Sequence, residues 1–320
     1  MEPFFNHEFR EFRRQDELEK LIAEHPHLDP TYIHIASSVW TKKIKDRIEK
    51  MWLEYRPYAD PEFPEKARVP GEFLGRSWEM TVGCALLGLG YTLQPKRSSF
   101  GPDAKIASKS PHIWVESVAS SHGTGRDALP QMIYGVAQSL PKNELLLRFS
   151  NAVISKYRKY KEPYLSSGLL KNDEPYVIAV GKGSIQFLDA YPPVALRYLL
   201  GIGDLTLLMP LDPQTGARKV TEQFFSRQPA VEKKSGEDVL VGFFDDEANA
   251  GISGVIFCEN HIMNHPDPLG SDFVLVRNPN ASAPLPNDFL PIGAEWVAKD
   301  NMVSYVEKKF IRSANAMDLW

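Results

Sequence analysis

The sequence contains only two cysteines in 320 residues, Cys84 and Cys258, and each lies in an apolar stretch. This scarcity favours two buried, reduced thiols over a disulfide or a metal-binding pair. No apolar run reaches the roughly 20 residues needed to cross a bilayer. Residues 1–14 mix Glu, His and Arg with Phe and do not form an apolar signal segment. We therefore expect a cytoplasmic protein with no membrane contact.

The chain also lacks a strong overall charge, because its formal net charge is only −4. This value argues against a protein that coats nucleic acid with its whole surface. One segment departs from the balance: residues 142–161 carry six basic residues and a single acid, Glu144, which gives a local charge of +5. A basic stretch on an acidic chain is a candidate polyanion contact. A solvated helix face is the alternative, and it is the commoner meaning of a charge run.

Hydrophobic residues make up 43% of the chain, which excludes disorder and indicates a globular fold. Apolar residues recur at helical spacing in residues 41–55, and residues 8–24 are also expected to be helical. The prolines of residues 56–70 argue against any regular element there and mark a boundary. We predict a helical N-terminal region (1–72), an α/β core (73–190) and a β-rich C-terminal extension (191–320).

The predicted core has the element order αβββαβ. Its elements are a helix at 75–88, strands at 91–94, 104–107 and 112–119, a long helix at 143–163 and a strand at 176–180. Beyond Gly183 the pattern becomes strand-rich, with strands expected at 205–211, 239–244, 252–258 and 273–276. These strands form either a second sheet or an extension of the first.

Three acids occupy positions that this element order would bring together. Glu79 lies in the first core helix, Asp103 follows Gly101-Pro102 at the start of a strand, and Glu116 is in the middle of the next strand. A lone carboxylate among β-branched and aromatic neighbours must face solvent, a partner or a metal. If the two strands pair, Asp103 and Glu116 share one edge of the sheet. Two carboxylates with water and phosphate oxygens suit Mg²⁺.

The run Gly101-Pro102-Asp103, with Glu116-Ser117-Val118 beginning thirteen positions after Asp103, resembles the motif of the PD-(D/E)XK superfamily, and the element order agrees. The resemblance covers about residues 74–181. It implies a restriction-endonuclease-like fold and a metal-dependent nuclease in which Asp103 and Glu116 bind Mg²⁺ or Mn²⁺ and Glu79 assists. The implied partner is nucleic acid, DNA before RNA. A homodimer is left open.

One position departs from the family pattern, since Val118 stands where the superfamily has a lysine that contacts the scissile phosphate. Lys156, beside the apolar stripe of the following helix, is the first candidate to replace it, and Lys105 is the second. We expect Arg148, Arg158, Lys159 and Lys161 of the basic helix to hold the nucleic-acid backbone. The missing lysine keeps a second interpretation open, a noncatalytic member of the same fold that binds nucleic acid or a protein.

Two other motifs carry weaker signals. His261 and His265 have the spacing of helical zinc ligands, but Pro266 and Pro268 disfavour a long helix there, so loop histidines are favoured. The glycine-rich turn at residues 120–127 lacks the Lys-Ser/Thr ending of a phosphate-binding P-loop. An ordinary flexible connection is the preferred interpretation of this turn.

Overall fold

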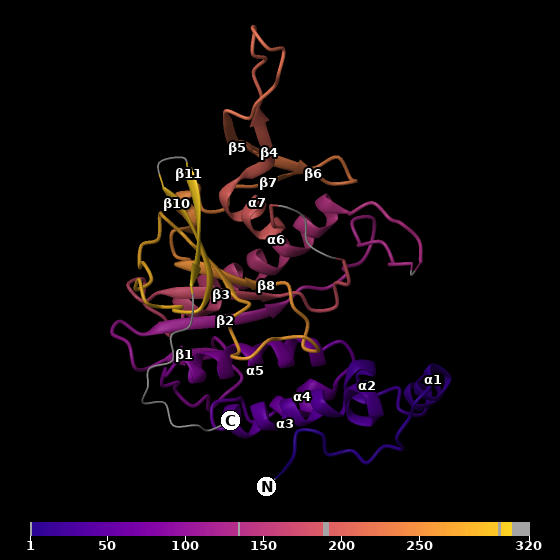
Figure 1. Cartoon of the computed structure of the whole chain (residues 1–320). Coiled ribbons are helices and arrows are strands. Elements are labelled where there is room, and N and C mark those ends of the chain that lie inside the picture. The colour runs from indigo at the N-terminus through magenta and orange to yellow at the C-terminus, as the bar shows by residue number, and fades with distance from the viewer. Residues whose placement is uncertain (1, 134, 188–191, 300–301, 309–320) are drawn as a thin grey trace.

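The computed structural model describes residues 2–133, 135–187, 192–299 and 302–308. These residues form a mixed α/β protein in which a seven-stranded sheet is flanked by helices (Figure 1). The strands of this sheet are β1 (Ala104–Ile106), β2 (Ile113–Ala119), β3 (Tyr176–Gly181), β8 (Gly254–Cys258), β9 (Val274–Arg277), β10 (Gly293–Lys299) and β11 (Met302–Lys308). The α-helices are α1 (Gln15–Glu24), α2 (Pro30–Ser37), α3 (Lys42–Tyr55), α4 (Phe63–Arg68), α5 (Phe73–Gly88), α6 (Lys142–Lys159) and α7 (Val194–Leu200).

The sheet has the strand order β1-β2-β3-β8-β9-β10-β11. Strands β2, β3 and β8 are parallel to one another, whereas β1 runs antiparallel to β2 and β9 antiparallel to β8. Every residue of β3 and of β8 is buried, which is typical of parallel strands covered on both faces. The central strands therefore have no face exposed to water.

Helix α5 covers one face of the central strands and α6 covers the other (Figure 1). On the α5 face, Val82 and Leu86 pack with Val115 and Ala179 in one hydrophobic cluster. On the α6 face, Phe149 and Val153 belong to a second cluster that also holds β3 side chains. The alternation of side chains along a strand thus assigns each residue of β2 to one of the two helices.

A third hydrophobic cluster joins the N-terminal helices to the far side of α5. Helix α3 crosses α5 closely at Gly83, where an added Cβ would lie 2.3 Å from the ring of Tyr55. The predicted helix at 41–55 is confirmed as α3, but the expectation of no regular element at 56–70 is wrong. Helix α4 forms there because Pro64 lies in its first turn, where a proline removes no helical hydrogen bond.

Several predicted boundaries differ from those of the structure. Residues 91–94 form no strand, only an isolated bridge between Leu93 and Ile106. The helix predicted at 8–24 begins at Gln15. The helix predicted at 143–163 ends as α6 at Lys159 and continues as a short π-helical segment, η2 (Tyr160–Leu165), in which Glu162 has extended backbone angles. Pro163 follows directly and disfavours a helical conformation of the residue before it.

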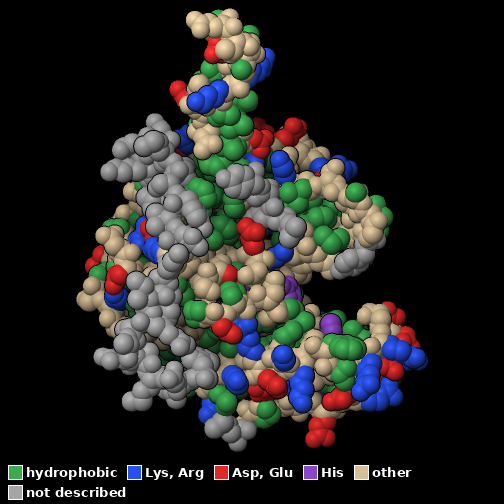
Figure 2. All heavy atoms as spheres, in the orientation of Figure 1, with side chains coloured by type: hydrophobic (Ala, Val, Ile, Leu, Met, Phe, Trp, Pro, Cys, Tyr) green, Lys and Arg blue, Asp and Glu red, His purple; other side chains and the backbone are tan. Residues whose placement is uncertain are grey.

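The C-terminal strands were expected to form either a second sheet or an extension of the first, and each alternative holds for some of them. Strands β8 to β11 extend the central sheet, while β4 (Ile202–Leu208) pairs with β5 (Glu222–Arg227), and β6 (Ala230–Glu232) pairs with β7 (Asp238–Leu240), in two separate ribbons. The β4–β5 ribbon projects from the body (Figures 1 and 2). Large apolar side chains such as Leu207 and Phe224 are exposed on it. Within the described ranges, no helix is both long and apolar enough to cross a membrane.

Candidate active site

The candidate site lies where the short strand β1 leaves the edge of β2 uncovered. Strand β1 pairs only with Ile113–Val115, so in the described part of the chain no strand lies beside β2 from Glu116 onward on that side. A pocket of about 340 Å³ opens there, between α5 and α6. Residues from both helices, from β2 and from the turn before β1 line it, among them Arg76, Glu79, Lys96, Asp103, Glu116, Ser117, Lys156, Lys159 and Tyr164.

Glu116 faces the α6 side of β2 and is 2% exposed. Its Oε1 atom lies 2.6 Å from the ammonium of Lys156 and 3.7 Å from that of Lys159. The Tyr164 hydroxyl donates to Oε2 at 3.3 Å. Burial and the nearby charge of Asp103 raise the pKa of Glu116, although the Lys156 ammonium acts against them.

Lys156 is the basic residue closest to Glu116. Burial lowers the pKa of its ammonium, but the charges of Glu116 and Asp103 outweigh that effect and hold the pKa above its usual value. Lys156 is therefore charged at neutral pH. The methylene chain of Lys156 lies at the border of the α6 apolar stripe. A long lysine side chain commonly buries its methylene groups in this way while its ammonium stays near polar groups.

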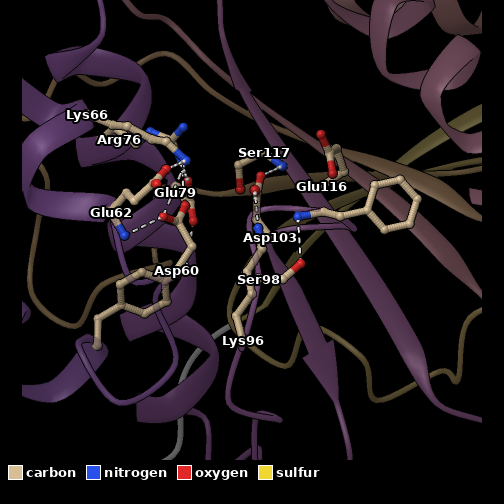
Figure 3. Close-up of polar contacts among 12 residues, drawn as sticks. Asp60, Glu62, Lys66, Arg76, Glu79, Lys96, Ser98, Asp103, Glu116 and Ser117 are labelled. Carbon is tan, nitrogen blue, oxygen red and sulfur yellow. Dashed lines mark hydrogen bonds and ion pairs between the residues drawn. The ribbon is translucent and has the colours of Figure 1, made fainter. Parts of the chain in front are cut away.

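Asp103 precedes β1 and ties it to the open part of β2. Its Oδ2 atom accepts the backbone N–H of Ser117 at 2.7 Å, and its Oδ1 atom lies 3.4 Å from the Lys96 ammonium. The N–H of Ser117 would otherwise be a strand-edge donor without a partner strand. In Figure 3, Asp103 lies between Glu79 on the α5 side and Glu116 on the α6 side.

Glu79 reaches the pocket from α5 and is 4% exposed. The Tyr55 hydroxyl donates to its Oε1 at 3.1 Å, and the Arg76 guanidinium contacts its Oε2 at 2.8 Å. Burial and the charge of Asp103 raise the pKa of Glu79 to about 8. Arg76 also lies 3.4 Å from Asp60, so the α5 side of the pocket contains its own ion-pair network (Figure 3).

Three carboxylates from three different elements thus line one pocket, and the charge of Asp103 raises the pKa of both others. Such mutual repulsion is what a divalent cation would relieve, and oxygen atoms are the ligands that Mg²⁺ prefers. The oxygens of Glu79, Asp103 and Glu116 do not all lie within 4.8 Å of one another. In the described part of the chain, the one group of three possible ligands that does so is Cys258, His265 and Asp272.

Comparison of the chain with known proteins gave no match: no family model matches it, and neither the curated proteins nor the solved structures include a match. The function must therefore be inferred from the pocket itself.

Of the four basic residues predicted to bind nucleic acid, Lys159 lines the pocket and the other three do not. Arg158 and Lys161 are exposed. The Lys161 ammonium lies over the Tyr157 ring at 4.6 Å. Arg148 packs against the turn at Gly123, where an added Cβ would collide with its guanidinium.

Lys105, the second candidate for the missing lysine, lies outside the pocket. Its ammonium is 4.6 Å from the centre of the Trp114 ring, and the residue does not line the cavity that holds Asp103. Position 118 itself is held by a half-buried valine that packs against the α6 cluster. Of the two candidate lysines, only Lys156 is brought to the acids.

Several residues that line the pocket or contact its acids were not foreseen from the sequence. Arg76 precedes Glu79 by three positions on α5, a spacing that places two helical side chains on one face and could have been recognised. Tyr55, Lys96 and Tyr164 come from segments with no motif. Their roles depend on tertiary contacts between distant parts of the chain.

Proposed function

We propose that the protein is a metal-dependent phosphodiester hydrolase that acts on nucleic acid, DNA before RNA, through the pocket at the open edge of β2. The observation that carries the proposal is the convergence of Glu79, Asp103, Glu116 and Lys156 on that pocket. These four residues, each expected to take part in phosphodiester hydrolysis, come from four separate segments of the chain. A set of unrelated surface charges has no reason to share one cavity.

The order of the elements supports a restriction-endonuclease-like core. Helix α5, the bridge at Leu93, strands β1 and β2, helix α6 and strand β3 follow one another as in αβββαβ, with a single bridge in place of the first strand. Asp103 stands directly before β1 and Glu116 lies in β2. These are the two positions in which the resemblance places its metal-binding acids.

The donor set fits a hard divalent cation, and Asp103 and Glu116 would hold it. When bound, Mg²⁺ or Mn²⁺ supplies a Lewis acid that lowers the pKa of a coordinated water and neutralises phosphate charge. The Lys156 ammonium, charged and held beside Glu116, stabilises negative charge that develops on the scissile phosphate. Glu79, whose pKa is about 8, holds a proton at neutral pH between Tyr55 and Arg76.

The pocket also has a feature that favours the noncatalytic alternative. Each of the three candidate acids already faces a cation: Lys156 and Lys159 contact Glu116, Lys96 contacts Asp103, and Arg76 contacts Glu79. Ion pairs of this kind can serve structure alone. A binding protein built on the same fold would retain them and would show no metal-dependent cleavage.

The decisive test is cleavage of DNA by the purified full-length chain in Mg²⁺ and in Mn²⁺. The wild type should cut, and Asp103→Asn combined with Glu116→Gln should lose cutting while remaining folded by circular dichroism. Asp288→Asn is the matched control, because Asp288 forms an exposed ion pair with Lys109 and does not line the pocket. Binding of DNA without cleavage by the wild type, in either metal and on either DNA or RNA, would support the noncatalytic alternative.

A further inference from the structure

A second cluster of metal-ligating groups lies at the ends of β8 and β9. Cys258 is the last residue of β8, Asp272 lies just before β9, and His265 is in the loop between these strands. The Cys258 Sγ atom is 3.2 Å from Asp272 Oδ2 and 3.9 Å from His265 Nδ1, and the last two atoms are 2.7 Å apart. The three side chains are buried.

The geometry differs from that of a Cys-His-Asp proton relay. In a relay the carboxylate bonds one ring nitrogen and leaves the other to the nucleophile. Here the thiol and the carboxylate both face the same nitrogen of His265, Nδ1. Three potential ligand atoms from three side chains, all within 4.8 Å of one another, surround one point. That convergence is what a coordinated ion requires.

The carboxylate of Asp272 supplies a second, independent observation. Its side chain is 8% exposed, and its Oδ1 atom is buried with no hydrogen-bond partner. Meanwhile Oδ2 contacts Cys258, Asn260 and His265. Buried carboxylate oxygens are seldom left unpaired, because an unmet acceptor loses its hydration without compensation. A cation held by both oxygens of this carboxylate would satisfy Oδ1.

The surroundings hold the three ligands in place. Asn260 donates to Asp272 at 2.9 Å, and the Trp78 ring stacks against the His265 imidazole with centroids 6.1 Å apart. Arg47 of α3 donates to the backbone carbonyls of His265 and Pro266, which fixes the loop from the other side. Supporting contacts of this type orient ligands before the ion arrives.

We propose that Cys258, His265 and Asp272 form a binding site for a zinc-class divalent ion. A thiolate, an imidazole and a carboxylate match the borderline-soft preference of Zn²⁺ and are unsuited to Mg²⁺, which takes oxygen ligands. Three protein ligands leave the fourth tetrahedral position for water or another donor. Ligation requires Cys258 to release its thiol proton, so ion binding is accompanied by proton release.

The site would fasten the end of β8, the loop and the start of β9 into one unit on the α5 face of the sheet. It is separate from the pocket that Glu79, Asp103 and Glu116 line, which we call the carboxylate pocket. The two are nevertheless close in sequence on α5, because Trp78, which stacks on His265, directly precedes Glu79. The two sites differ in their ligand chemistry. Removal of one therefore leaves the other testable.

The probe is Co²⁺, which substitutes for zinc and absorbs strongly in the near ultraviolet when a thiolate ligates it. The full-length protein, stripped with a chelator and kept reduced, should develop this charge-transfer band on titration with Co²⁺, and Zn²⁺ should abolish it. Cys258→Ser should lose the band. Cys84→Ser is the matched control, because Cys84 is also a buried free thiol and, among the described residues, its one hydrogen bond goes to the Met51 carbonyl.

Folding of each variant is checked by circular dichroism. If Cys258→Ser does not fold, the proposal is tested with His265→Gln and Asp272→Asn instead. Each of these substitutions should weaken or abolish the charge-transfer band. The Asp103→Asn, Glu116→Gln variant should keep the band, which separates this site from the proposed nuclease. A wild type without the band, or a folded Cys258→Ser that retains it, would overturn the proposal.

Discussion

The two ligand clusters of this protein lie on neighbouring parts of one sheet but are arranged in opposite ways. In the carboxylate pocket, Glu79, Asp103 and Glu116 each face an ammonium or a guanidinium, and they interact with one another mainly by repulsion. In the Cys258–His265–Asp272 cluster, the potential ligands face one another, and no Lys or Arg contact to them is found among the described residues apart from the Arg47 contact to the loop backbone. A hard ion must compete with cations in the first cluster, whereas a softer ion meets ligands already gathered in the second.

The largest expected effect comes from removing the cation nearest the acids. Lys156→Met should lower metal-dependent cleavage 100-fold or more, which corresponds to about 2.7 kcal/mol of transition-state stabilisation. Lys156→Arg should restore only part of it, because a planar guanidinium does not replace a compact ammonium. The measurement is single-turnover cleavage of DNA.

Lys159→Met is the matched control for this substitution. Lys159 lies 3.7 Å from Glu116 and its side chain is 53% exposed, so its removal should matter less. Lys156→Met also breaks a buried ion pair, which costs about 3 kcal/mol of stability in typical cases. Activity is therefore compared at a temperature where both variants are folded. Full cleavage by Lys156→Met would remove this residue from the mechanism.

Metal-induced stabilisation sharpens the contrast between the two clusters. At ten times its dissociation constant, a bound ion raises the free energy of unfolding by about 1.4 kcal/mol, since RT ln(1 + [L]/Kd) applies. Mg²⁺ should raise the melting temperature of the wild type and of Cys258→Ser, but not of Asp103→Asn with Glu116→Gln. Zn²⁺ should still stabilise the latter. An unchanged Mg²⁺ response in the double variant would place that ion elsewhere.

A smaller effect should appear in the pH dependence of stability without metal. The pKa of Glu79 is about 8 in the folded protein against an ordinary value of 4.5, so the folded state holds a proton that the unfolded chain has released. The stability that this proton gives is full below the ordinary pKa and is lost as the pH rises through about 8. The metal-free protein should therefore weaken as the pH rises from about 5 to about 8, and this decline should level off above about pH 8.

Urea denaturation across this pH range measures the effect. Glu79→Gln should flatten the decline, because an amide does not titrate. The exposed Glu65→Gln in α4 is the control and should follow the wild type. A decline of the same size in Glu79→Gln would assign the pH dependence to other groups.

The smallest expected effect concerns the exposed part of the basic helix. Replacing Arg158 and Lys161 with Gln should weaken DNA binding modestly and reduce the slope of log K against log salt by roughly 0.9 for each phosphate that is no longer neutralised. Fluorescence anisotropy at several salt concentrations gives the slope. Lys159 is left unchanged because it belongs to the pocket. Identical slopes would show that these two residues only face solvent.

The sequence was sufficient to predict the positions of the acids within their elements. The alternation around Glu116 and the turn before Asp103 are local patterns, and the apolar stripe of α6 placed Lys156 at its border. A strand was predicted at residues 91–94 from their alternating pattern, but such a pattern does not show whether a partner strand is available. In the structure Leu93 forms only an isolated bridge with Ile106. The helix α4 was missed because a count of prolines ignores where in a helix a proline stands.

The contacts that complete both clusters could not be predicted from local patterns. Lys96 and Tyr55 reach the acids from segments whose own sequence suggests only a turn and an amphipathic helix. Cys258 ends β8, and residues 265 and 272 follow at intervals of seven positions in a loop with no regular element, so no periodicity points to their meeting. The favoured interpretation of His265 as a loop residue is correct, but its burial beside Cys258 depends on the packing of that loop.

The close crossing of α3 and α5 has a practical consequence for anyone who divides this chain into pieces. The Tyr55 ring fills the space over Gly83 and its hydroxyl bonds Glu79. Asp60 and Lys66, the latter from α4, line the pocket, so the N-terminal region forms part of its wall. A fragment that starts at residue 73 would expose the apolar side chains of Phe73, Met80 and Cys84 to water and would lack one partner of Glu79. Expression of the full chain is therefore the sounder starting point for any assay, and enlarging Gly83 offers a way to disturb the pocket without touching an acid.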